Sequence, residues 1–166
     1  MHTIGEKIIY GANGVMEIVD VREETIGDVA RKYYVLRDLN SVSVSQIFVP
    51  VDNDRLVSSM RPLLTKEEAM DMISRIKSIP EAEWKKDNRV RSEKFRHVIE
   101  TGDREGMISV IKAVYENGVK RHEEGKKNYL ADESIMRKAE KVIYSELSIV
   151  LGIPENEVAN FITENC

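Results

Sequence analysis

The chain has little of what crosslinks a secreted protein or anchors a membrane protein. Its single cysteine, Cys166, cannot close an internal disulfide. No stretch approaches the roughly 18 uninterrupted apolar residues that a membrane helix needs. The N-terminal residues also lack the basic and then apolar profile of a secretion signal. Together these absences predict a cytoplasmic protein.

Residue patterns that carry catalysis or bind metals are also missing. The histidines His2, His97 and His122 stand far apart, outside any metal-ligand spacing. The glycine turn at residues 11–14 is followed by neither a Lys-Ser or Lys-Thr pair nor a helix, so it is no phosphate loop. Cys166 has no activating partner nearby. We expect no enzyme, no cofactor and no metal. A small hydrolase or transferase with an unrecognised site is the alternative, which convergent polar groups in a deep cleft would support.

The only tryptophan, Trp84, is the most informative residue that is present. It precedes a basic run in a protein of net charge −4, namely Lys85, Lys86, Arg89, Arg91, Lys94 and Arg96. An aromatic ring beside such a run suits a surface that grips phosphates and stacks or wedges against a base. The competing interpretation is that Trp84 anchors a loop and that the charges form a solvated face.

The first sixty residues have the pattern of β-structure. Four short segments are apolar or alternate between apolar and polar residues, and Gly- or Asn-containing turns lie at residues 11–14 and 25–28. The expected strands cover residues 7–10, 15–21, 32–36 and 42–51. Short strands at this spacing predict a small antiparallel barrel.

From Thr65 onward the apolar period becomes helical. Thr65 is the expected cap of a helix that Pro80 stops, and a second helix is expected from near Trp84 to Thr101. Gly102 and Asp103 separate it from a third helix, whose expected buried residues are Met107, Ile108, Ile111, Val114 and Tyr115. An apolar stripe follows Asp132 and ends at Gly152, before a last short helix that begins at Pro154. The predicted fold class is α+β in two domains, with an antiparallel barrel at residues 1–64 and a bundle of about five helices at residues 65–166.

Several segments, in this order, resemble the CarD/CdnL family of bacterial transcription regulators that bind RNA polymerase. The opening residues 4–10 with Gly14-Val15 resemble the family's first motif, and Phe48-Val49-Pro50-Val51 its "VPV" strand. Residues 33–36, 57–63 and 138–147 resemble further strand and helix motifs. Trp84, followed by Glu100-Thr101-Gly102-Asp103, resembles the family's tryptophan and its helix junction.

The resemblance implies a Tudor-like barrel that binds the β subunit of RNA polymerase through residues such as Ile47, Phe48, Val49 and Pro50. It also implies a helical domain that contacts promoter DNA at the upstream edge of the transcription bubble. There the tryptophan enters the minor groove, largely independently of sequence, and stabilises the open complex. The expected DNA-binding residues are Trp84, Lys85, Lys86, Arg89 and Arg91.

Two positions depart from the family pattern. Asp87 stands where the family often has arginine, and it would repel a phosphate. Phe48 replaces a basic residue that some members carry before Val-Pro, which predicts a more apolar contact with polymerase at an edge strand; packing in the barrel core is the alternative for Phe48. The leading hypothesis is a transcription regulator without catalytic activity. The alternative is a β-barrel adaptor that binds polymerase or another large partner and makes no direct DNA contact.

Overall fold

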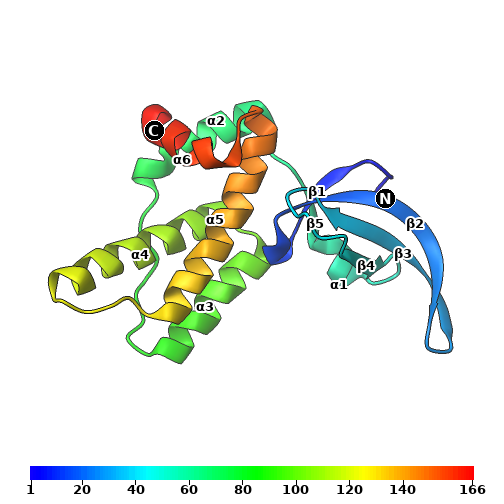
Figure 1. Cartoon of the computed structure of the whole chain (residues 1–166), viewed down its shortest axis with the longest axis horizontal. Coiled ribbons are helices and arrows are strands. Elements are labelled where there is room, and N and C mark those ends of the chain that lie inside the picture. The colour runs from blue at the N-terminus through cyan, green and yellow to red at the C-terminus, as the bar shows by residue number, and fades with distance from the viewer. The chain divides into compact units, whose positions relative to one another are not determined.

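A computed structural model describes residues 1–166, which form two compact units, Met1–Leu63 and Leu64–Cys166. The first unit is built on an antiparallel sheet and the second is a helical bundle (Figure 1). This arrangement confirms the fold class expected from the sequence and fits a Tudor-like barrel followed by a bundle.

Five antiparallel strands make up the sheet of the N-terminal unit, in the order β4-β3-β2-β1-β5. Strands β4 and β5 therefore have one neighbour each within the sheet. The short helix α1 (Asp54–Ser58) connects them. The strands are β1 (Lys7–Tyr10), β2 (Val15–Ile26), β3 (Val29–Asp38), β4 (Gln46–Pro50) and β5 (Met60–Pro62).

A core of apolar side chains from all five strands holds the sheet together. Because successive residues of a strand point to opposite faces, β4 contributes Val49 to this core, and Ile47 packs against its margin. The buried members are Ile8, Met16, Ile18, Tyr34, Leu36, Val49 and Met60.

The hairpin of β2 and β3 extends well beyond the strands predicted from sequence, as the long curved ribbon in Figure 1 shows. The added length is exposed on nearly all of its residues, including the apolar Ile26 and Val29, so it has no buried face to give an alternating pattern in the sequence. Opposite charges lie directly across the two strands there, with Glu23 opposite Lys32 and Glu24 opposite Arg31. Gly27, at φ +68°, makes the two-residue turn that closes the hairpin.

Five α-helices form the C-terminal unit, and α5 lies against the other four. The central helix buries the stripe predicted from sequence, including Ile135, Ala139, Val142, Ile143 and Leu147. The helices are α2 (Lys66–Arg75), α3 (Asn88–Thr101), α4 (Arg104–Glu123), α5 (Leu130–Leu151) and α6 (Val158–Asn165), with short 3₁₀ turns η2 (Ile76–Ser78) and η3 (Glu155–Glu157).

The helix ends match the capping residues in the sequence. Thr65 caps α2 in a capping box with Glu68, Asp103 caps α4, and Gly102 and Gly152 end α3 and α5 in the left-handed conformation. Hydrogen bonds from Thr65 lower the pKa of Glu68. A depressed carboxyl pKa means that the box contributes to stability at neutral pH and that this contribution is lost as the pH falls through the lowered pKa.

Two helix predictions were wrong. The second helix begins at Asn88 and not near Trp84, because the Asp87 carboxylate accepts a hydrogen bond from the Val90 N–H and caps the helix there. Tyr115 on α4 is 66% exposed, while Val110 and Ala113 are buried. The buried face of α4 is therefore rotated from the one that the apolar pattern suggested.

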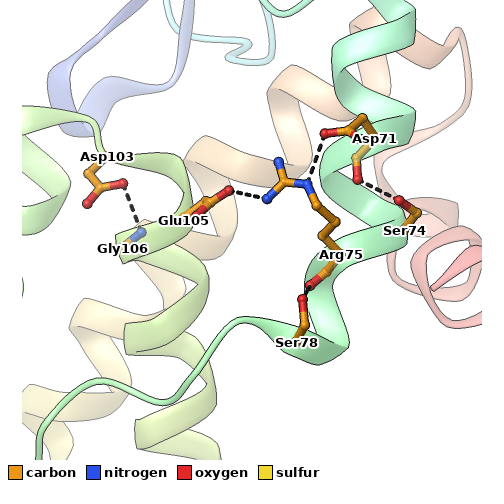
Figure 2. A network of polar contacts seen from close by, with 7 residues as sticks. All are labelled: Asp71, Ser74, Arg75, Ser78, Asp103, Glu105 and Gly106. Atoms are coloured by element: carbon orange, nitrogen blue, oxygen red, sulfur yellow. Dashed lines mark hydrogen bonds and ion pairs between the residues drawn. The ribbon is translucent and has the colours of Figure 1, made fainter.

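Ion pairs join the ends of the helices within this unit. Arg75 of α2 lies between Asp71 of its own helix and Glu105 in the first turn of α4 (Figure 2). The buried Glu146 of α5 accepts from Arg104 and from the backbone N–H of Leu64, which ties the start of the unit to its central helix. No helix combines the length and apolar character needed to cross a membrane.

The capping box at Thr65 gives a test of the helical unit. Thr65→Ala removes the side-chain acceptor for the Glu68 N–H, so the free energy of unfolding should fall by about 1 kcal/mol. Urea denaturation followed by far-ultraviolet circular dichroism measures it. Thr163→Ala is the matched control, because the Thr163 hydroxyl is exposed and bonds only within its own helix. Equal effects of the two substitutions would contradict the role of the cap.

Candidate functional sites

Trp84 lies in an irregular segment between η2 and α3 that is attached to the bundle at several points. Lys112 of α4 donates to the carbonyl oxygens of Ile76 and Ile79, at the start of the segment. The Ala82 N–H donates to the Ser109 carbonyl of α4 over 3.0 Å. At the other end, Arg91 Nη1 donates to the Lys85 carbonyl over 2.8 Å. The backbone on both sides of Trp84 is therefore held in place although it forms no helix.

Arg91 is the centre of the contacts around Trp84. Its side chain is buried, and its Nε and Nη2 donate to the two carboxylate oxygens of Asp132 in α5 at 3.0 and 2.8 Å. Nη2 also donates to Asn88 Oδ1. Together with the bond to the Lys85 carbonyl, these contacts give each guanidinium nitrogen at least one acceptor. Two buried charges are stable together only when they are paired and hydrogen-bonded in this way.

The indole of Trp84 packs on this buried arginine. The Arg91 Cζ atom lies 4.2 Å from the centre of the ring, within the range of a cation–π contact. Phe95 meets the ring edge-on, with centroids 6.2 Å apart. The ring stays half-buried and borders a small hollow lined by Glu81, Ala82, Ala113, Glu116, Asn117 and Lys120. Trp84 is thus both anchored and accessible.

The predicted phosphate-binding residues lie in different environments. Lys86 is exposed. Arg89 is 88% exposed at its side chain and meets only Glu93, at 3.3 Å. Lys85 is bonded to Glu83 at 2.6 Å; this bond raises the pKa of Lys85 and lowers the pKa of Glu83, so both are charged at neutral pH. Arg91 is 1% exposed, so its guanidinium does not reach the surface.

Asp87, which was expected to repel a phosphate, has a structural role at the start of α3. Its side chain caps α3, and a carboxylate at a helix N-terminus is also favoured by the helix dipole. The negative charge therefore faces the backbone N–H groups of the first turn. Lys86 and Arg89 flank it and leave the exposed charge at this helix start positive.

Sequence reasoning missed Asp132 and Lys120. Asp132 was read only as the place after which an apolar stripe begins, and nothing in the sequence connects it with Arg91, 41 positions earlier. Lys120 lines the hollow beside Trp84 from the far half of α4. The last turn of α4 carries Lys120, Arg121 and His122, a basic cluster that is visible in the sequence outside residues 85–96.

In the sheet, the predicted polymerase-binding residues are divided between two faces. Val49 is buried in the core and Ile47 packs at its margin. Phe48 points away from this cluster and is 36% exposed, with Tyr33 edge-on at 6.1 Å and the Arg22 guanidinium 5.6 Å from its ring centre. Pro50 is half-buried at the strand end. Strand β4 is an edge strand, so Phe48 is an apolar side chain beside an unpaired backbone.

The other surface features do not gather around these residues. A wide groove of the helical unit lies between α4 and the start of α5, with Val114, Tyr115, Val119, Leu130 and Met136 on its walls. It contains none of the predicted site residues. No group of three His, Cys, Asp or Glu side chains is arranged to hold a metal ion.

The buried pair yields a stability prediction. Asp132→Ala leaves the Arg91 guanidinium buried without its carboxylate, so the free energy of unfolding should fall by about 3–5 kcal/mol. The control Glu93→Ala removes the exposed carboxylate near Arg89 and should cost no more than about 1 kcal/mol. Urea unfolding of both variants makes the comparison, and an Asp132→Ala protein as stable as Glu93→Ala would refute the importance of the pair.

Comparison with known families gives one match, which covers the N-terminal unit. Residues 2–64 match the CarD-like/TRCF RID domain. No significant match was found among curated proteins. The match ends where the helical unit begins, so it confirms the resemblance for the N-terminal unit. Over residues 2–64 the chain is therefore similar to the CarD-like/TRCF RID domain family, which interacts with the β subunit of RNA polymerase.

Proposed function

We propose that this protein is a transcription regulator that binds the RNA polymerase β subunit through its N-terminal sheet and promoter DNA through the Trp84 surface, stabilising the open complex. The family of residues 2–64 supports the polymerase contact. The observation that carries the DNA contact is the half-buried indole, held by a buried ion pair and flanked by the exposed cations Lys86 and Arg89.

An anchored indole suits a minor-groove wedge for a physical reason. Unstacking a base step costs a few kcal/mol, and an inserted side chain offsets this cost best when no further ordering is needed on binding. The contacts of Arg91 with Lys85, Asn88 and Asp132 supply that order in advance. Phosphate contacts from exposed cations add affinity without reading sequence.

The structure alters the proposed roles within the basic segment. Lys86 and Arg89 are the proposed phosphate contacts, because both are exposed and neither is held by more than one exposed partner. Lys85 contributes less, since Glu83 already neutralises it. Arg91 was expected to contact DNA; we propose instead that it positions Trp84, because its guanidinium is buried.

For the polymerase contact, the proposal centres on β4. A partner strand can extend the sheet at this edge through backbone hydrogen bonds, and an exposed Phe48 adds an apolar anchor. Val49 and Ile47 support the strand from within the core and do not themselves face a partner.

The DNA proposal is tested by the lifetime of the open complex on a promoter of the ribosomal type. The protein should lengthen this lifetime, and Trp84→Ala should reduce the gain about tenfold, the value of one base–aromatic contact. Tyr115→Ala, at another exposed aromatic residue of the same unit, is the control and should leave the lifetime unchanged.

The salt dependence of DNA binding tests the role of the exposed cations Lys86 and Arg89. Replacing both Lys86 and Arg89 by Ala should lower the slope of log affinity against log salt by about 0.9 for each phosphate that is no longer neutralised. If neither the lifetime nor this slope responds to any of these substitutions, the adaptor without DNA contact is the better description.

The polymerase contact is tested separately. Phe48→Ala in the full chain should weaken binding to the isolated β subunit by about tenfold, as expected for an apolar anchor at the centre of an interface. Ile26→Ala is the matched control, because Ile26 is an exposed apolar residue of the same sheet at the far tip of the hairpin. Unchanged binding by Phe48→Ala, measured by surface plasmon resonance, would place the contact elsewhere on the unit.

A further inference from the structure

Four aromatic and cationic side chains, beginning with Trp84, form a continuous series of contacts in space. After the Trp84–Arg91 contact, the Arg91 Cζ lies 5.2 Å from the centre of the Tyr129 ring. The Arg121 Cζ lies 4.0 Å from the same ring. We call Trp84, Arg91, Tyr129 and Arg121 the aromatic–cation series. Each contact falls within the range of a cation–π interaction.

The four residues come from four separate segments of the helical unit. Trp84 precedes α3 and Arg91 belongs to it, Tyr129 directly precedes α5, and Arg121 lies in the last turns of α4. The series therefore joins the Trp84 segment to the α4–α5 connection, the chain between Glu123 and Leu130. This connection lies far from residues 85–89 in the sequence, and its link to Trp84 exists only in the folded bundle.

The outer end of the series is attached to the α4–α5 connection by backbone contacts. Arg121 Nε donates to the Lys127 carbonyl over 2.8 Å, and the Lys126 N–H donates to the Arg121 carbonyl over 2.8 Å. Gly125, at φ +72°, supplies the left-handed residue that lets the chain turn back. Arg121 thus lies against the connection and the Tyr129 ring together.

The side chain of Tyr129 is not used to cap α5. Tyr129 stands at the N-cap position of α5, but its side chain makes no capping bond, and the Glu133 N–H donates to its backbone carbonyl. A substitution of the side chain leaves that backbone bond available. The ring is partly exposed, yet it contacts the buried Arg91, which supports Trp84.

Asp132 alone does not determine the orientation of Arg91 toward the indole. The carboxylate binds Nε and Nη2, along one edge of the guanidinium, and rotation about this edge changes the tilt toward Trp84. The contacts beyond the carboxylate are Asn88 Oδ1, the Lys85 carbonyl and the rings of Trp84 and Tyr129. Of these, Tyr129 is the contact that comes from the α4–α5 connection.

We propose that Tyr129 and Arg121 are positioning residues for Trp84. Tyr129 holds the Arg91 guanidinium against the indole, and Arg121 holds Tyr129. The state of the α4–α5 connection thereby affects the orientation of Trp84. The consequence for DNA rests on the proposed function, whereas the positioning itself is a property of the free protein.

Trp84 is itself the reporter for the test, because the chain has no other tryptophan. Its emission, excited where tyrosine does not absorb, and its quenching by acrylamide are measured on the full chain. Tyr129→Leu removes the ring and should raise the quenching constant about two- to fivefold, the population shift that matches one partly exposed cation–π contact. Tyr129→Phe keeps the ring and should retain the quenching constant of the unaltered protein.

Two further variants separate positioning from general stability. Tyr115→Leu, on α4 but outside the series, should leave Trp84 quenching unchanged. Arg121→Gln removes the charge at the outer end of the series and should raise the quenching constant, as Tyr129→Leu does. This second variant keeps the test valid if Tyr129→Leu does not fold. Unchanged quenching in both Tyr129→Leu and Arg121→Gln, or an equal rise in Tyr129→Phe, would overturn the proposal.

The open-complex lifetime distinguishes this inference from the proposed function. If Trp84→Ala shortens the lifetime while Tyr129→Leu changes neither quenching nor lifetime, the inference fails and the DNA function stands. If Tyr129→Leu raises quenching while neither variant alters the lifetime, the positioning stands and the DNA function fails. If Trp84→Ala and Tyr129→Leu both shorten the lifetime while Tyr129→Phe keeps the lifetime of the unaltered protein, the positioning and the DNA function are both supported.

Discussion

The buried ion pair between Arg91 and Asp132 is the interaction on which the Trp84 surface depends. It joins α3 to α5, and the remaining donors of the same guanidinium bind Asn88 and the backbone of Lys85. An irregular segment without helical hydrogen bonds would otherwise lose its order readily. One buried cation therefore gives a loop residue a fixed position, which a binding surface requires.

The two units present their candidate surfaces in different ways. In the N-terminal unit the alternation of a strand exposes Phe48 and buries its neighbours, and the edge of the sheet leaves backbone groups available. In the helical unit the surface is a loop supported by side chains of α3, α4 and α5, with exposed cations at the start of α3. The first surface lies within residues 2–64, which match a known domain family, whereas the second lies outside the matched residues.

Much of the framework was predictable from local chemistry. Thr65, Gly102, Asp103 and Gly152 were recognised as helix ends because capping depends on a residue and its nearest neighbours. The exposed half of the β2–β3 hairpin was missed, since its charged residues carry no apolar alternation. The prediction that Tyr115 is buried was wrong, because the sequence of a half-apolar helix does not reveal which of its faces the neighbouring helices cover.

The sequence by itself determined the order of sheet and bundle, the helix ends at Thr65, Gly102, Asp103 and Gly152, and the presence of one tryptophan beside a basic run. Only the tertiary structure decided which of those basic residues reach solvent. Arg91 and Arg89 are two positions apart on one helix, yet one is buried against Asp132 and the other is exposed. The carboxylate that pairs with Arg91 belongs to Asp132, 41 positions away in the sequence. A buried charge needs such a partner because the cost of its desolvation must be compensated by a nearby opposite charge, and only the fold brings that charge close.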